Sequence, residues 1–212
     1  MTGSASSSTR APLGIPTGTV AVAASGSTVY AAWTEAYPTL GPPAVVLAQH
    51  GTTAGSAVAI ENAVLAGLAL TPEGPELAAN RCFDGVCLGL VGSAGLDGIV
   101  AGFAAASDGS RAVLLAGDRG LNFYRSAVAL PVRLSLNRDL SGRVDGVSGG
   151  AVTLYRERAD ASRVAVGTFP VGVDGSFAAA DPTGGPAAST YRAVYVDPVT
   201  SIPYAALLPA AN

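Results

Sequence analysis

Two cysteines have the most distinctive chemistry in this sequence. Cys82 and Cys87 flank residues 83–86, whose central Asp-Gly predicts a tight turn that places the cysteines opposite each other on adjacent strands. Such a pair can form a disulfide, which closes a very short loop and stabilises the hairpin locally. Two buried free thiols are the second interpretation. A redox pair or a metal site is the third, but redox motifs place two residues between the cysteines and a metal site needs further ligands.

Three aromatic side chains form a candidate binding surface. Tyr30, Trp33 and Tyr37 lie close together near the end of a predicted hairpin, and flat aromatic faces suit carbohydrate rings. Packing in the core or at a sheet edge is the alternative interpretation. The one histidine, His50, follows an apolar segment, and the chain has no Gly-x-Ser-x-Gly segment to supply a nucleophile. We therefore expect His50 to be exposed to solvent.

Carboxylates are few, and their neighbours indicate turns. Only 13% of the residues are charged, the net charge is −3, and all twelve basic residues are arginine. Glu73, Glu76, Asp97 and Asp108 lie next to or close to Gly or Pro, where Asp typically bonds its own backbone. We therefore predict a protein that is not an enzyme and binds no metal or cofactor. A weakly acidic chain without a basic patch also indicates that nucleic acid is not a partner.

Arginines concentrate at one predicted hairpin of the C-terminal part. Three of them occur within eight residues, interspersed with Glu157 and Asp160. A solvated face is the simplest interpretation of this group, and contact with a partner is the other. The candidates for an assembly contact are Arg10, Arg156, Arg158 and Arg163.

The elements that must position these residues are β-strands. Period-two alternation bounded by Gly, Asp and Pro recurs along the chain. Residues 99–104 and 111–116 form the clearest hairpin, and with residues 121–124 they resemble one blade of a β-propeller. Residues 19–49 show a similar pattern, and residues 57–92 a weaker one. Two or three units are too few to close a propeller, so either several copies close a ring or the strands pack as a sandwich.

Two segments depart from the strand pattern. Residues 61–67 are compatible with one helical turn. Residues 88–106 are the longest weakly polar stretch, but their five glycines and central Asp97 argue against a membrane-spanning helix, and we expect no membrane insertion. No apolar run follows a basic start near Met1, so we expect no secretory signal peptide.

The C-terminal part contains seven predicted strands in about 80 residues, a spacing typical of immunoglobulin-like (Ig-like) sandwiches. Residues 130–208 resemble bacterial and phage Ig-like domains, which occur on cell-surface and virion proteins. The segments that carry the resemblance are 142–144 (Gly-Arg-Val), 150–156 (Gly-Ala-Val-Thr-Leu-Tyr-Arg), 174–177 (Asp-Gly-Ser-Phe) and 190–195 (Thr-Tyr-Arg-Ala-Val-Tyr).

The resemblance implies several structural features. The Gly-Arg-Val and Val-Thr-Leu-Tyr strands should lie in one sheet, and the Asp-Gly-Ser-Phe turn should introduce a later strand. Tyr191, at the start of the penultimate strand, is the candidate for the corner hydrogen bond of such domains. Residues 197–205 also resemble the ends of some actinobacterial-phage tail and minor virion proteins.

These observations predict an all-β protein in three parts. Residues 1–16 form a flexible N-terminal arm, residues 17–127 a β-rich meander domain, and residues 128–212 an Ig-like β-sandwich. The meander domain is built either as a sandwich or from partial propeller-like blades.

The predicted function is that of a non-enzymatic structural virion protein, which acts in assembly or surface attachment as a phage tail, head-fibre or decoration component. Its expected partners are other virion proteins or copies of itself, with a trimer as one arrangement, and a host-surface glycan is a further ligand. It would be assembled in the host cytoplasm and exposed on the virion after release. The alternative is an oligomeric, lectin-like glycan-binding module that carries Tyr30, Trp33 and Tyr37 at its sugar sites.

Overall fold

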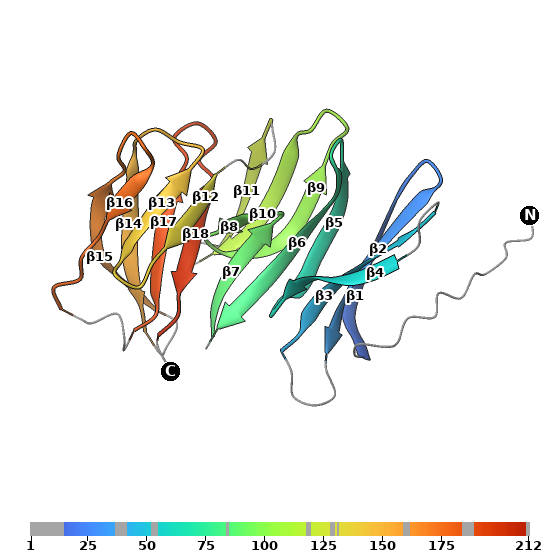
Figure 1. The fold of residues 1–212 in the computed structure, drawn as a ribbon, viewed down its shortest axis with the longest axis horizontal. Helices are drawn as coiled ribbons and strands as arrows, with labels where there is room; N and C mark the ends of the chain where they lie inside the picture. Colours follow the sequence, from blue (N-terminus) through green and yellow to red (C-terminus); the bar gives the residue numbers. More distant parts are fainter. Residues whose placement is uncertain are drawn as a thin grey trace, which may run out of the picture.

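The structure, a computed structural model, is all-β. It describes residues 15–36, 42–51, 55–83, 85–117, 120–127, 130, 132–158, 162–183 and 189–210. These residues form eighteen strands in four antiparallel sheets (Figure 1). No helix that is long and apolar enough to cross a membrane occurs among them. Most of the predicted arm lies outside the described residues, and the first strand already begins at Ile15.

The first sheet is a meander at one end of the molecule. It consists, in order, of β1 (Ile15–Ser25), β2 (Thr28–Ala36), β3 (Ala44–His50) and β4 (Gly55–Glu61). Gly26, whose φ of +58° suits a tight turn, joins β1 to β2 as the sequence predicts. The inner face of this sheet buries Ala32 and Val45 against residues of the next two strands.

The second sheet has eight strands and runs through the middle of the molecule, in the order β15-β14-β17-β18-β8-β7-β6-β5. Four strands come from the first part of the chain and four from the second, and β18 pairs with β8 where Tyr204 lies opposite Leu96. One sheet therefore spans both predicted domains. Its strands are β5 (Val64–Thr71), β6 (Gly74–Phe83), β7 (Val86–Val91), β8 (Ala94–Leu96), β14 (Ala151–Glu157), β15 (Arg163–Pro170), β17 (Tyr191–Val196) and β18 (Pro203–Leu208).

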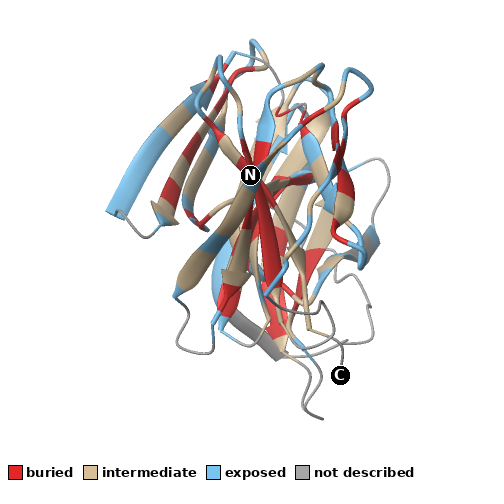
Figure 2. Cartoon of the chain, turned by 90° about the vertical axis from the view of Figure 1, so that its left-hand side faces the viewer, coloured by how far each residue is buried: buried red, intermediate tan, exposed pale blue. Residues whose placement is uncertain are grey.

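Two three-stranded sheets pack against one face of this long sheet. One is β9 (Ile99–Ala105), β10 (Arg111–Gly117) and β11 (Gly120–Ser126), and the other is β12 (Arg133–Leu136), β13 (Ser141–Asp145) and β16 (Ser176–Ala178). Both contribute to the largest core cluster, which includes Val113 and Val144 from the small sheets and Leu96 and Tyr204 from the long one. The β1–β4 sheet packs on the opposite face, at β5 and β6. Figure 2 shows the buried residues gathered between these layers.

Most of the predicted strands are present, but β8, through which the two halves of the long sheet pair, was not predicted. The 99–104 and 111–116 hairpin is confirmed as β9 and β10, with β11 completing a three-stranded sheet. All seven C-terminal strands are confirmed as β12 to β18, and the Asp-Gly-Ser-Phe segment introduces β16, which begins at its serine. Alternation and turn chemistry are local signals, so they identify strands reliably.

Two expectations are wrong. Residues 61–67 form no helical turn, because Asn62 (φ +54°) bends the chain and β5 starts at Val64 to pair with β6. The Gly-Arg-Val and Val-Thr-Leu-Tyr strands lie in different sheets, since β13 pairs with β12 and β16 whereas β14 joins the long sheet. Three glycines with positive φ, at positions 146, 149 and 150, carry the chain from one sheet to the other.

Candidate functional site

Four charged side chains from distant parts of the sequence meet at the middle of the long sheet. Arg192 on β17 donates through Nε to Glu157 (2.5 Å), through Nη1 to Asp97 (2.9 Å) and through Nη2 to the carbonyl oxygen of Cys87 (2.9 Å). Arg163, at the start of β15, donates through Nη1 to both oxygens of Asp97 at 2.9 Å. We call Asp97, Glu157, Arg163 and Arg192 the junction cluster, because they connect the two halves of the sheet.

The junction cluster is largely removed from water. The side chains of Arg192 and Glu157 are each only 4% exposed, and those of Asp97 and Arg163 are 16% and 18% exposed. Two guanidinium groups balance two carboxylates, as buried charges require. The guanidinium carbon of Arg163 also lies 5.5 Å from the centre of the Tyr155 ring, within range of a cation–π contact.

The turn after β8 fixes the position of the Asp97 carboxylate. The Asp97 N–H donates to the carbonyl oxygen of Pro203, the first residue of β18, at 2.8 Å. The next residue must be glycine, because Gly98 has a φ of +144° and a Cβ there would lie 2.8 Å from the Ala116 carbonyl oxygen. The backbone therefore holds Asp97 between the two arginines.

A cavity of about 300 Å³ adjoins the junction cluster. Its wall offers charged groups of both signs beside the backbone of several small residues. The cavity is lined by Gly85, Val86, Cys87, Gly98, Ile99, Ala116, Gly117, Glu157, Arg163 and Arg192. Since each guanidinium here is bonded to a carboxylate, the junction cluster joins the strands through hydrogen-bonded ion pairs.

The two cysteines form a disulfide beside the junction cluster. Cys82 on β6 and Cys87 on β7 lie directly opposite each other, with an S–S bond of 2.04 Å and a Cα–Cα distance of 4.0 Å. Cys82 is exposed and Cys87 is half-buried. Because the Cys87 carbonyl accepts a hydrogen bond from Arg192, the disulfide hairpin is attached to the junction cluster.

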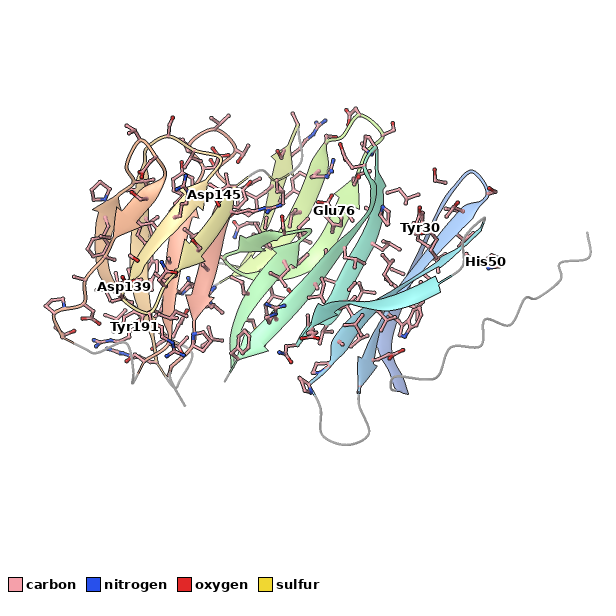
Figure 3. The ribbon with its side chains drawn as sticks, viewed as in Figure 1. Tyr30, His50, Glu76, Asp139, Asp145 and Tyr191 are labelled. Carbon is pink, nitrogen blue, oxygen red and sulfur yellow. A yellow bond between two sulfur atoms is a disulfide. The ribbon has the colours of Figure 1, made fainter. Side chains whose placement is uncertain are left out.

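The aromatic candidates do not share one surface. Tyr30 and Trp33 are three positions apart on β2, so their side chains emerge on opposite faces of the sheet. Trp33 donates through Nε1 to Glu35 at 2.9 Å. Tyr37 lies outside the described residues. His50 is exposed at the end of β3, as expected, near the same end of the molecule as Tyr30 (Figure 3).

The arginine-rich hairpin is not simply a solvated face. Glu157 and Arg163 belong to the junction cluster, and Arg156 contacts the Asp181 carboxylate at 3.4 Å. Arg158 is exposed. Arg10 and Asp160 lie outside the described residues. Of the four predicted assembly arginines, two therefore have partners within the chain.

Tyr191, the candidate for the corner hydrogen bond, is fully buried at the start of β17. Its hydroxyl donates to the Asp181 carboxylate at 2.8 Å, so the bond reaches a side chain ten residues upstream rather than the backbone. Burial alone would raise the pKa of Asp181, but hydrogen bonds from Thr183 and Tyr191 and the charge of Arg156 together lower it below its usual value. Burial raises the pKa of Tyr191, and the bond to Asp181 raises it further.

Turn carboxylates behave largely as their sequence context predicts. Asp108, Asp139 and Asp174 each accept the backbone N–H of the serine two residues later, at 2.9 to 3.0 Å. Hydrogen bonds from these serines lower the pKa of all three carboxyls. Glu73 and Glu76 instead bond the buried Arg111 on β10, with Glu76 at 2.6 Å.

The sequence does not predict the junction cluster, because its members are far apart along the chain. Asp97 is 66 residues from Arg163 and 95 residues from Arg192. One signal was present. Arg192 is the single charged residue of an otherwise apolar segment, and a charge in a buried strand requires a partner. The position of Asp97 next to Gly98 indicates only a turn.

Within the described part of the chain, no group of three or more His, Cys, Asp or Glu side chains is placed to hold a metal ion. In comparisons with known proteins, no family model, curated protein or solved structure matches this chain.

Proposed function

We propose that this protein is a structural component of an extracellular protein assembly, a virion, and that it acts through protein–protein contacts. One observation carries the proposal: large apolar side chains are exposed on the outward faces of the outer sheets. Val20 and Val22 on β1 are 57% and 65% exposed, and Leu121 and Phe123 on β11 are 65% and 68% exposed. Clustered apolar side chains on a surface mark sites of interaction with other molecules.

The use of charge supports a scaffold role. Arg111 and Arg192 are buried and bonded to carboxylates, and each connects separate sheets or separate halves of one sheet. Such pairs fix the relative position of layers, which a component of a large assembly requires. The Cys82–Cys87 disulfide suits an oxidising exterior, which a released particle meets.

The C-terminal module supports the virion assignment through its resemblance to Ig-like domains. Three strands, β12, β13 and β16, face four strands, β15, β14, β17 and β18, as in an Ig-like sandwich. We therefore assign residues 128–212 to this fold, as a module that projects from or binds to neighbouring subunits. Fold alone carries no function, so the assembly role rests on the exposed surfaces.

The test is the fractionation of particles from a culture that expresses the gene. Particles are purified on a density gradient, and peptides of this chain are quantified in each fraction. We expect them to sediment with particles in a fixed ratio to the other particle proteins, also after a high-salt wash. Recovery of the chain in the soluble fractions alone would overturn the proposal.

A further inference from the structure

We infer that β11 is the contact strand of a two-fold symmetric dimer of this chain. This inference rests on the proposed assembly function and deepens it, because it names a second copy as one partner. Three features of β11 carry it: an exposed apolar face, a free edge and a register that fits itself.

The outward face of the β9–β11 sheet is apolar and open to solvent. Leu121 and Phe123 lie on this face of β11, opposite Ala116 and Leu114 of β10. Ile99 of β9, which is 43% exposed, continues the same row beyond Ala116. Arg125 is the only charged residue of β11.

The edge of β11 is free to pair with another strand. β11 is the last strand of its sheet, and five of its seven residues are exposed, including Asn122 on the inner face. Because Gly117 and Gly120 close the β10–β11 hairpin, the N–H and C=O groups of every second residue from Leu121 onward point away from β10. No backbone hydrogen bond outside the ladder reaches Leu121, Phe123 or Arg125 from the rest of the described chain.

The strand has little of the usual protection of an edge. β11 contains no proline, Arg125 is its single charged residue, and its pairing with β10 runs from Gly120 to Ser126 without a bulge. Natural proteins place such features on exposed edges to prevent pairing between molecules. The absence of a proline and a bulge from a strand that also exposes Leu121 and Phe123 indicates that pairing is used.

The sequence of β11 fits a second copy of itself. With the two-fold axis at Phe123, antiparallel pairing aligns all seven residues, and Gly120 lies opposite Ser126 of the other copy. Arg125 then lies opposite Leu121, so no like charges face each other. The two Phe123 side chains meet at the axis, and two three-stranded sheets become one six-stranded sheet with a continuous apolar face.

A second copy fits this edge better than the N-terminal residues of the same chain. Residues 1–14 contain four Ser, two Thr and one Arg, and only two large apolar residues. A polar strand from that segment would end the apolar row at β11, whereas a second β11 continues the row across the two-fold axis.

The first test is a cysteine trap at the axis. In Phe123→Cys the new thiols of two copies would lie opposite each other, and the native cysteines do not compete because they form a disulfide. Val173→Cys is the matched control, since Val173 is 92% exposed in the turn before β16, which belongs to a different sheet from β11. Under mild oxidation we expect Phe123→Cys to give a covalent dimer that a reductant reverses, at least tenfold faster than Val173→Cys. Equal rates would overturn the inference.

The second test is the mass of the chain without a trap. One strand pair with a few apolar side chains is a small interface, so sedimentation velocity is measured across the micromolar range. The wild-type mass should approach twice 20.8 kDa as concentration rises, Phe123→Arg should remain at 20.8 kDa, and Val173→Arg should behave as wild type. Circular dichroism checks that each variant is folded.

A wild-type monomer at every concentration, or a Phe123→Arg dimer as stable as the wild type, would contradict the inference. The two proposals fail separately. If the chain sediments with particles but does not dimerise through β11, the proposed assembly function stands and the proposed β11 contact is wrong.

Discussion

Glu157 and Arg192 illustrate how a chain with few charges uses them. Each side chain is 4% exposed, and their bond of 2.5 Å belongs to a cluster in which charges of opposite sign are balanced. A buried charge without its partner is costly, because the interior does not solvate it. We therefore expect that breaking a buried ion pair lowers the free energy of unfolding much more than breaking an exposed one.

The first prediction concerns Glu157→Gln. This change leaves Arg192 with one carboxylate fewer, and we expect the free energy of unfolding near neutral pH to fall by about 3 kcal/mol. Asp145→Asn is the matched control, because it breaks the exposed Arg143–Asp145 pair and should cost less than about 0.5 kcal/mol. Urea unfolding of both variants measures the difference. Equal losses would show that the junction cluster contributes no more than a surface pair.

The second prediction concerns Tyr191→Phe and pH. The pKa of Asp181 is lowered in the folded state, so its ionised form stabilises the fold above the usual value of 3.8, and this contribution is lost as pH falls through the lowered pKa. Removing the Tyr191 hydroxyl takes away one bond to that carboxylate and should cost about 1 to 2 kcal/mol near neutral pH. The loss should shrink when unfolding is measured at about pH 3. A loss that does not depend on pH would mean that the hydroxyl acts by packing alone.

Residue roles were predictable where they are local. Asp108 and its serine are two positions apart, so the turn can be deduced from three residues. Asp97 could not be placed in the same way, because its partners Arg163 and Arg192 reach it only through the pairing of β18 with β8. No spacing of residues in the sequence predicts the contact of Asp97 with these two arginines.

At the scale of elements, the β6–β7 hairpin combines a turn, a disulfide and a hydrogen bond to another module. The bond between Cys82 and Cys87 closes a loop with four residues between the cysteines, so it restricts the unfolded chain only slightly. The Cys87 carbonyl also accepts Arg192, which ties this local hairpin to β17.

The third prediction is that the disulfide contributes modestly to stability. Replacing both cysteines by serine should lower the free energy of unfolding by about 2 kcal/mol, the loop-entropy value for so short a loop. The measurement is urea unfolding of the double variant beside the wild type, with and without reductant. Reductant should destabilise the wild type and leave the variant unchanged, and a response of the variant would contradict this assignment.

Strands were predictable from the sequence, but their assignment to sheets was not. Alternation and Gly turns located β9 and β10 and all seven C-terminal strands. β13 and β14 belong to different sheets because each pairs with different strands. The glycines between them do not by themselves determine to which sheet β14 belongs. The failed helical turn at residues 61–67 has a similar cause, since pairing with β6 overrides weak local preference.

At the scale of the whole molecule, one long sheet organises three smaller ones. The largest core cluster extends from Ala78 to Tyr204 and includes residues on both sides of position 128. The β1–β4 sheet has a separate cluster on the opposite face. This arrangement leaves the outer faces of the outer sheets available for contacts.

The fourth prediction is that residues 64–208 unfold together. Because β8 and β18 share one sheet and one core, calorimetry should give a single transition for them, with equal calorimetric and van't Hoff enthalpies. A separate early transition is compatible only with the β1–β4 sheet, which Trp33 fluorescence reports. Independent melting of residues 128–212 would contradict the shared core.

The measurement that tests the central claim most directly is immunogold electron microscopy of intact particles, with an antibody against the turn that exposes Val173 and Asp174. The account predicts gold at a regular position on the particles, and none on particles from a strain that lacks the gene. Unlabelled particles in a preparation where the antibody detects the soluble chain would contradict the assembly function.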